Sequence, residues 1–363
     1  MPAEAATGSA SAGSGDPDPQ LEGAGAVAGL RVWRVENRRG DGAGAAAKFG
    51  VAAWPTSQYG DFYRGDAYLV LKSTQLPHGG GLAHDVHFWL GSQCTKDEAT
   101  VAAYKAVELD TLLSGAPVQH RETEGKESPQ FQSYFRSLRY MNGGIDSGFS
   151  HVTPDEYEAR LYQVRKTKHT TRAFQCPMEA SSLHHGDAFV LDAGREVYAW
   201  FGDECSPFER ARAANLQAEI VDGRMGKARK GDADDDAFWE ALGGSATDVR
   251  AAVHDKVEAD EIDATKCDLY RLSDATGELA FTHVEAGGQV LDEKMLDTDD
   301  VFIIDAQVAT VVWIGAGSSD EEKANAMRTA MTFLERHGRP LHTPVNVIKQ
   351  GQSSDLFRSI FKK

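Results

Sequence analysis

Acidic residues recur in this chain of 363 residues at a spacing that is repeated three times. Each of three tryptophans is followed nine positions later by a glutamate, and each is preceded by an aspartate. The aspartate lies 13 positions before the tryptophan in the second and third copies and 23 positions before it in the first. The three sets are Asp66, Trp89 and Glu98; Asp187, Trp200 and Glu209; and Asp300, Trp313 and Glu322.

These residues offer hard oxygen donors: two carboxylates and the main-chain carbonyl of a residue such as Gly65 or Gly186, which precede two of the aspartates. Ca²⁺ takes about 6–8 such donors at roughly 2.3–2.6 Å, whereas Mg²⁺ needs stricter octahedral geometry and keeps its waters. A simpler interpretation is that each aspartate caps a turn and each glutamate caps a helix. The threefold repetition favours a calcium site over capping alone.

The elements that would position these carboxylates follow from the hydrophobic pattern. Each aspartate opens a short apolar run typical of a buried strand, and a second such run ends in an aromatic–apolar–glycine sequence. Each glutamate lies in the first turn of a helix, predicted over about 96–113, 207–220 and 319–336. A preceding strand, a following strand and a short helix complete each unit. This order predicts an α+β fold, with a mixed central sheet between one long and one short helix.

The repeat and the composition divide the chain into three units joined by linkers. An Ala/Gly/Ser-rich beginning is expected to be a disordered tail, and a Gly/Ala-rich insertion over 38–48 is expected to be a flexible loop. The predicted organisation is a tail over 1–29, unit 1 over 30–150, a linker over 151–157, unit 2 over 158–250, a linker over 251–263 and unit 3 over 264–363.

Composition excludes several classes of protein. Hydrophobic residues make up 41% and charged residues 26%, which is enough apolar material for globular cores. The net charge of −17 excludes a nucleic-acid binder or a polybasic membrane binder. No apolar run approaches the roughly 18–20 residues of a membrane span. Four scattered cysteines and the lack of a secretory signal predict free thiols and a cytoplasmic protein.

Motifs for catalysis are missing from the sequence. It contains no EF-hand loop, P-loop or His-Glu-x-x-His motif, and the chain is expected not to be an enzyme. Other reactive groups have simpler interpretations. The pair His184–His185 is expected in a solvated turn, Cys94 as an inert thiol and the acidic run Asp232–Asp236 as a solvated loop.

Four stretches of unit 1 form distinctive motifs, beginning at Tyr59, His87, Val118 and Gly143. They read YGDFYRGDAY, HFWLGSQCTKDE, VQHRE and GGIDSGF. These stretches closely resemble the first domain of the gelsolin/villin family, and the likeness extends through all three units. In domain number the chain is similar to the three-domain, severin- and fragmin-like members. The resemblance implies three gelsolin-like domains, calcium-activated severing of actin filaments and capping of their barbed ends.

The resemblance also implies sets of calcium ligands. An ion shared with actin would be held by a further set at the end of the first long helix. The implied ligands are Gly65, Asp66, Glu98 and Ile145 in unit 1; Gly186, Asp187, Glu209 and Asp255 in unit 2; Asp299, Asp300 and Glu322 in unit 3; and Asp110, Gly115 and Pro117 for the shared ion.

Two further surfaces follow from the same resemblance. The actin contact would be the first long helix with a neighbouring loop, and an inhibitory phosphoinositide site would be formed by basic residues. The implied actin contacts are Ala103, Tyr104, Lys105, Val107 and Phe149. The implied phosphoinositide contacts are Arg136, Arg139, Arg160, Arg165, Lys166 and Lys168, for which a solvated basic face is the simpler interpretation.

The sequence leaves some alternatives open. Secreted gelsolin has a disulfide where this chain has Ala188 and Phe201, which agrees with a cytosolic protein. The chain is expected to be a monomer whose closed arrangement of units opens when Ca²⁺ binds. A calcium-dependent capper that does not sever, and a calcium-regulated phosphoinositide-binding scaffold, are the other functions considered.

Overall fold

Three units of one topology make up the described part of the chain. The implied binding residues Ile145, Phe149, Lys168 and Asp255 lie outside the described residues. The computed structural model describes residues 18–38, 48–77, 80–144, 159–166, 170–224, 226–253, 262–273, 280–285, 290–340 and 343–361.

Each unit contains five equivalent strands, one long helix and one short helix. Unit 1 has β1 (Gly29–Arg38), β2 (Lys48–Ala53), β4 (Ala67–Gln75), β5 (Leu82–Leu90), α1 (Lys96–Leu112), β6 (Val118–Thr123) and α2 (Pro129–Ser133). Unit 2 has β8 (Arg160–Lys166), β9 (Thr171–Cys176), β10 (Ala188–Asp192), β11 (Glu196–Phe201), α3 (Pro207–Gly223), β12 (Arg229–Gly231) and α4 (Asp236–Ala241). Unit 3 has β13 (Asp268–Ser273), β14 (Ala280–Glu285), β15 (Val301–Asp305), β16 (Thr310–Ile314), α5 (Asp320–Arg336), β17 (Val345–Lys349) and α6 (Asp355–Ile360).

The strand order is the same in all three units. It runs β2-β1-β4-β5-β6, β9-β8-β10-β11-β12 and β14-β13-β15-β16-β17. The last two strands of each unit are parallel and the other neighbours are antiparallel, so every sheet is mixed. The sequence repeat is therefore a repeat of one folded unit.

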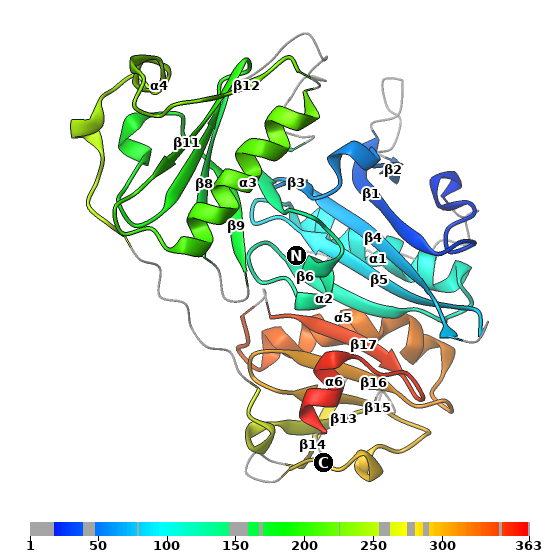
Figure 1. Cartoon of the computed structure of the whole chain (residues 1–363). Helices are drawn as coiled ribbons and strands as arrows, with labels where there is room; N and C mark the ends of the chain where they lie inside the picture. Colours follow the sequence, from blue (N-terminus) through cyan, green and yellow to red (C-terminus); the bar gives the residue numbers. More distant parts are fainter. Residues whose placement is uncertain are drawn as a thin grey trace, which may run out of the picture.

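The three units are joined through two shared sheets (Figure 1). Strand β17 of unit 3 pairs antiparallel with β6 of unit 1, which makes one sheet of ten strands. Two short strands of unit 1, β3 (Asp61–Tyr63) and β7 (Arg139–Met141), extend the sheet of unit 2 to seven strands through β9. The repeat alone predicts one sheet per unit. The edges pair because unpaired main-chain groups at a buried sheet edge are costly.

Helices cover both faces of the sheets. Helices α1 and α5 lie on one face of the ten-stranded sheet over a single apolar cluster, and α2 and α6 contribute to clusters on the opposite face. Alternation along β4 separates these layers, because Leu69 and Leu71 belong to the α1 cluster and Tyr68 and Val70 to the α2 cluster. Helices α3 and α4 divide unit 2 in the same way. The predicted α+β architecture is confirmed.

Residues 18–28, expected in the tail, pack on unit 1. A short 3₁₀ turn, η1 (Pro19–Leu21), buries Leu21 in the cluster beneath α1. Asp18 forms an ion pair with Lys105 of α1 at 3.3 Å. Trp33 Nε1 also donates to the Gln20 carbonyl and the Val51 amide to the Asp18 carboxylate, so this segment is ordered although its composition suggested disorder.

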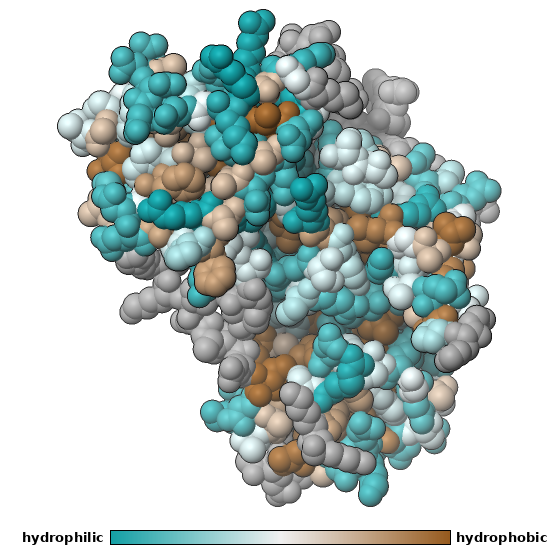
Figure 2. Space-filling view, viewed as in Figure 1, coloured by the Kyte–Doolittle hydropathy of each residue, from teal (hydrophilic) through white to brown (hydrophobic). Residues whose placement is uncertain are grey.

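The second strands β2, β9 and β14 were not predicted from the sequence, since they are less apolar than the central strands. In the part of the chain that the structure describes, no helix is both long and apolar enough to cross a membrane. Hydrophilic and intermediate residues cover most of the face in Figure 2, with hydrophobic residues in small groups among them.

Candidate functional site

The three repeated aspartates are held by the same main-chain contact. In each unit, the amide of the glycine that ends the tryptophan motif donates to the aspartate carbonyl. The pairs are Gly91 and Asp66 at 3.1 Å, Gly202 and Asp187 at 3.0 Å, and Gly315 and Asp300 at 2.9 Å. A Cβ on any of these glycines would lie only 2.1 to 2.3 Å from a carbonyl oxygen of the turn before the aspartate. Close backbone approach therefore explains why each motif ends in glycine.

The three repeated glutamates close capping boxes at the starts of the long helices. Glu98 Oε2 accepts from the main-chain N and from Oγ1 of Thr95, both at 2.9 Å. Equivalent boxes pair Ser206 with Glu209 and Ser319 with Glu322. Capping is thus a real role of all three glutamates. All three boxes use Oε2, so Oε1 lies outside the box, and in unit 2 Glu209 Oε1 accepts from the main-chain N of Lys166 at 2.8 Å.

Pocket 1, formed by Gly65, Asp66 and Glu98, is enclosed by the chain that follows β7. The Asp66 side chain is 0% exposed and that of Glu98 4%. The Gly65 amide donates to the Gly143 carbonyl at 2.7 Å, and a Cβ on Gly144 would lie 2.4 Å from Asp66 Oδ1. The chain therefore runs directly over the Asp66 carboxylate just before the implied fourth ligand.

The carboxylates of pocket 1 both lie near the thiol of Cys94. Burial and then the negative charges of Glu98 and Asp66 raise the pKa of Cys94 to about 12. In unit 2, burial raises the pKa of the equivalent Cys205, with Glu209 and Asp187 adding to that rise. A raised pKa agrees with the expectation that Cys94 is an inert thiol.

Pocket 2, formed by Gly186, Asp187 and Glu209, repeats this arrangement. A Cβ on Gly186 would lie 2.4 Å from the Val253 carbonyl oxygen. Val253 thus occupies the place that Gly143 has in pocket 1, and the implied ligands Asp255 and Ile145 each follow two residues later. His184 adds an imidazole Nε2 at 3.3 Å from Asp187 Oδ2, so the pair His184–His185 is not simply a solvated turn.

Pocket 3, formed by Asp299, Asp300 and Glu322, is the most open of the three. Asp299 is exposed, and Asp300 and Glu322 are only partly buried. Ser318, which precedes the capping serine as Cys94 precedes Thr95, has a buried Oγ with no hydrogen-bond partner among the described residues. An open set of carboxylates holds an ion less firmly than the enclosed sets of units 1 and 2.

The set Asp110, Gly115 and Pro117 at the end of α1 surrounds a cation supplied by unit 3. Lys349 Nζ lies 2.9 and 3.0 Å from the Asp110 carboxylate oxygens and 2.6 Å from the Gly115 carbonyl. Gln352 of unit 3 donates to the Pro117 carbonyl at 3.4 Å. Lys349 could not be predicted as a partner from the sequence, because it lies 239 positions from Asp110.

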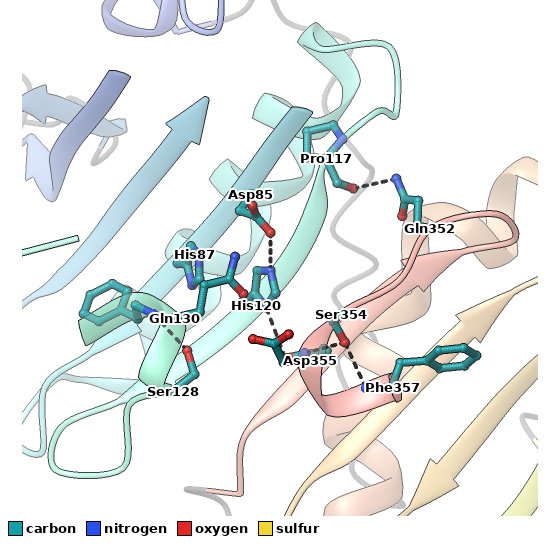
Figure 3. Close-up of polar contacts among 12 residues, drawn as sticks. Asp85, His87, Pro117, His120, Ser128, Gln130, Gln352, Ser354, Asp355 and Phe357 are labelled. Atoms are coloured by element: carbon teal, nitrogen blue, oxygen red, sulfur yellow. Dashed lines mark hydrogen bonds and ion pairs between the residues drawn. The ribbon is translucent and has the colours of Figure 1, made fainter. Parts of the chain in front are cut away.

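Side chains also meet across the paired strands β6 and β17, here called the seam (Figure 3). His120 of β6 hydrogen-bonds Asn346 of β17 at 3.2 Å and Asp85 at 2.9 Å. His87 stacks on His120 with ring centroids 4.2 Å apart and hydrogen-bonds Glu122 at 2.9 Å. All four ring nitrogens have partners, since His87 Nε2 also meets a tyrosine hydroxyl.

Burial, and then neighbouring His120, lower the pKa of His87. For Glu122, burial raises the pKa but the hydrogen bond from His87 and further partners outweigh it, so the pKa is lowered overall. Asp85, His87 and His120 are the group of nitrogen and carboxylate ligands that lie within 4.8 Å of one another in the described residues. Because every ring nitrogen of the two histidines already has a hydrogen-bond partner, this group is part of a structural network rather than an open metal site.

Of the implied actin contacts on helix α1, Tyr104 is the most exposed. Tyr104 is 50% exposed, whereas Ala103 and Val107 are partly buried. Lys105 is engaged by Glu108 at 2.7 Å, in addition to its pair with the amino-terminal segment. The outward face therefore centres on Tyr104.

The basic residues implied in phosphoinositide binding do not form one positive surface. Arg139 donates to both carboxylate oxygens of Asp61 at 2.5 and 2.7 Å, and Arg136 lies 3.5 Å from Glu219. The Arg165 guanidinium lies over the Phe174 ring at 4.5 Å.

A cavity of about 280 Å³ lies between unit 1 and unit 2, beside Arg139 and Arg160. Three carboxylates and three guanidinium groups line it, so its charges balance and do not favour an anionic headgroup. These charged residues are Asp61, Asp192, Glu219, Arg139, Arg160 and Arg224.

The donor chemistry of pockets 1 and 2 fits a calcium ion. Both combine two nearly buried carboxylates with main-chain carbonyls where the chain crosses the pocket glycine. Oxygen donors of this kind suit Ca²⁺, which Asp66 and Glu98 would hold in unit 1 and Asp187 and Glu209 in unit 2.

Comparisons with known proteins agree with the repeat. The family model described as "Gelsolin repeat" matches residues 51–132, 175–235 and 282–358, one stretch in each unit. The chain is 37% identical over 355 residues to "Gelsolin, cytoplasmic" of Homarus americanus, covering 94% of this chain and 45% of that protein. It is 38% identical over 354 residues to "Gelsolin" of Drosophila melanogaster, covering 93% of this chain and 42% of that protein.

A chain of the solved "Thorarchaeota 2DGel3/rabbit actin complex" matches at 23% identity with a TM-score of 0.24, over 56% of this chain and 99% of that one. The chain spans less than half the length of the two curated relatives. The three family-model matches and the repeated topology place this chain in the gelsolin family, with three gelsolin repeats.

Proposed function

We propose that this chain is a calcium-activated actin-binding protein that severs filaments and caps their barbed ends. Its membership of the gelsolin family supports actin as the partner. The proposal includes a cytoplasmic location and a chain that acts without catalysis. Severing breaks only non-covalent contacts between actin subunits, so no catalytic residue is required.

The contact of Lys349 with the end of α1 carries this proposal. The oxygen atoms of Asp110 and Gly115 are placed to hold a cation, and unit 3 supplies an ammonium group there. Another cation can use these oxygens only after Lys349 has left. Departure of Lys349 removes one contact between units 1 and 3, so ion binding and release of unit 3 from unit 1 are coupled.

Helix α1 is the proposed wedge. Its inner residues Ala102, Ala106 and Leu109 pack on the sheet, which leaves the outer side around Tyr104 for a groove on actin. An exposed aromatic ring beside small side chains is typical of a helix-in-groove contact. The wedge needs a clear approach, and unit 3 packs beside the end of the same helix.

Charge supports regulation by a divalent cation. The chain carries a formal net charge of −17, and the pocket carboxylates add to this repulsion locally. Calcium bound at these carboxylates would supply positive charge that offsets their repulsion. In this proposal unit 2 binds the side of a filament and unit 1 supplies the wedge.

The experiment is imaging of single actin filaments with the full chain, at micromolar free calcium and in chelator. We expect internal breaks with calcium and intact filaments in chelator. Glu98→Gln and Glu209→Gln should each lower the breakage rate by about tenfold or more, the effect of roughly 1.4 kcal/mol of lost ion binding. The matched control is Glu240→Gln, which changes an exposed carboxylate of α4.

Other outcomes separate the alternatives. Filaments whose barbed ends stall without internal breaks would assign capping alone. Failure to co-sediment with actin in either buffer, together with calcium-dependent binding to phosphoinositide vesicles, would assign a lipid-binding scaffold. The charge-balanced cavity around Arg139 and Arg160 makes that scaffold the less supported function.

A further inference from the structure

One strand position contacts the pocket aspartate in every unit. The position is Arg34 in β1, Gln163 in β8 and Arg271 in β13. Each lies opposite the residue two positions after the aspartate, with register pairs Arg34–Tyr68, Gln163–Phe189 and Arg271–Phe302. The three side chains are therefore structurally equivalent, although the sequence spacing between strand and aspartate differs.

Each of these side chains reaches the carboxylate. Arg34 Nη1 lies 3.5 Å from Asp66 Oδ2, and Arg271 Nη2 lies 2.8 Å from Asp300 Oδ1. Gln163 Nε2 donates to Asp187 Oδ2 at 2.6 Å. Pockets 1 and 3 thus contain a cation that belongs to the chain, whereas pocket 2 receives a neutral amide at the same place.

The arginine of pocket 1 is held loosely. Its side chain is 22% exposed and lies over the Trp54 ring at 5.3 Å, and its Nε is buried with no hydrogen-bond partner among the described residues. A contact of 3.5 Å to Asp66 is longer than a well-made charged hydrogen bond. Arg34 can therefore leave Asp66 without losing a full set of bonds.

We propose that this strand position sets the calcium affinity of each pocket, with an arginine as internal counter-ion in pockets 1 and 3 and a neutral amide in pocket 2. Calcium entering pocket 1 or 3 must displace a guanidinium from the aspartate, or share the carboxylate with it. Calcium entering pocket 2 meets no guanidinium on the aspartate, only the amide of Gln163 and the imidazole of His184. Pocket 2 therefore fills at the lowest calcium concentration. This inference rests on the proposed calcium sites and explains how three copies of one site respond at different concentrations.

The test is isothermal titration of the full chain with CaCl₂ in backgrounds that leave one pocket intact. Asp187→Asn with Asp300→Asn isolates pocket 1, and Asp66→Asn with Asp300→Asn isolates pocket 2. In the first background we expect Arg34→Gln to tighten calcium binding by about tenfold, since an opposite charge near a carboxylate shifts its equilibria by about one to three orders of magnitude. In the second, Gln163→Arg should weaken binding by a similar factor.

The matched control for pocket 1 is Arg31→Gln. Arg31 lies on the same strand but over the Trp33 ring at 4.7 Å, away from the pocket, and its replacement should leave the calcium affinity unchanged. Arg271→Gln makes the same test in a background that leaves only pocket 3 intact, and calcium binding should again tighten. This substitution does not disturb an apolar core, because the Arg271 side chain is 55% exposed.

The outcomes distinguish this inference from the function on which it rests. Lack of calcium binding in every background would overturn the proposed calcium sites themselves. Calcium binding whose affinity is unchanged by Arg34→Gln, Arg271→Gln and Gln163→Arg would overturn the counter-ion role alone. An equal change with Arg31→Gln would show a general charge effect and would also overturn it.

Discussion

Single glycines at the pockets have a steric role that can be tested. A Cβ on Gly202 would lie 2.3 Å from the His185 carbonyl oxygen, a main-chain atom that cannot move without disturbing the turn before Asp187. We expect Gly202→Ala to destabilise unit 2 by about 1–3 kcal/mol, the usual cost of overpacking. Urea unfolding of the full chain would measure this loss.

The control for that variant is Gly223→Ala. Gly223 ends α3, and nothing lies within 4 Å of the position of an added Cβ. Alanine is the better helix former, so this substitution should leave stability unchanged or raise it slightly. Equal destabilisation by both substitutions would contradict the steric argument.

A buried charge at the contact of units 1 and 2 gives a second prediction at this scale. Glu127 accepts from Trp89 Nε1 and Tyr140 Oη, both at 2.8 Å, and pairs with Arg172 of β9. Glu127→Gln would leave Arg172 as a buried cation without its counter-charge. We expect a loss of about 3–5 kcal/mol in the free energy of unfolding, measured by urea denaturation.

Replacement of both partners should be milder than replacement of one. In Glu127→Gln with Arg172→Met, no buried charge remains unpaired, so part of the stability returns. Glu240→Gln in α4 serves as the surface control and should change stability by less than about 0.5 kcal/mol. A double variant as unstable as the single one would contradict the assigned role of the ion pair.

At the scale of elements, the seam between β6 and β17 should weaken in acid. The pKa of His87 is lowered by burial and by His120, so folding favours its neutral form. The stability that the neutral ring contributes is fully present above the ordinary histidine pKa of 6.5. It is lost as the pH falls through the lowered pKa of His87 in the folded chain. The lowered pKa of Glu122, whose ordinary value is 4.5, acts in the same direction at lower pH.

Hydrogen exchange of the β6 and β17 amides in chelator would measure this effect. We expect faster exchange at pH 5.5 than at pH 7.5, after correction for the intrinsic rates. In His87→Gln the titrating ring is removed while a donor to Glu122 is kept, so the pH dependence should flatten. The same pH dependence in the variant and the wild type would assign the change to another group.

For the whole molecule, Lys349 is expected to oppose opening. Lys349→Ala removes the ammonium held by Asp110 and Gly115 but leaves the strand pairing of the seam in place. Small-angle scattering during a calcium titration should show expansion at about two- to tenfold lower calcium in the variant, a coupling of roughly 0.5–1.4 kcal/mol. Lys227→Ala, which removes an exposed ammonium of unit 2, is the control. An unchanged calcium midpoint of the expansion would contradict this role of Lys349.

Much of this architecture can be predicted from the sequence because the repeat is local. The spacing from Trp89 to Glu98 reflects a strand end, a turn and a capping box, all set by neighbouring residues. The helices and central strands therefore lie within a few residues of their predicted bounds. The repeat also identified the pocket aspartates, although their roles as calcium ligands remain predictions.

The contacts between units could not be predicted in this way. Lys349 meets Asp110 across 239 positions, and Arg121 donates to the Thr343 carbonyl across 222 positions. Such pairs depend on how whole units pack, and each residue alone looks like an ordinary surface charge. The same holds for Arg34, whose meaning is visible only when the register with β4 is known.

The sharing of strands has a consequence for any opened form. Separation of β6 from β17 would leave two exposed edge strands, each with unpaired main-chain donors and acceptors. Exposed edge strands are templates for pairing with a strand from another molecule. An opened chain that does not quickly meet its target would therefore be prone to self-association. The closed form keeps both edges paired until the chain opens.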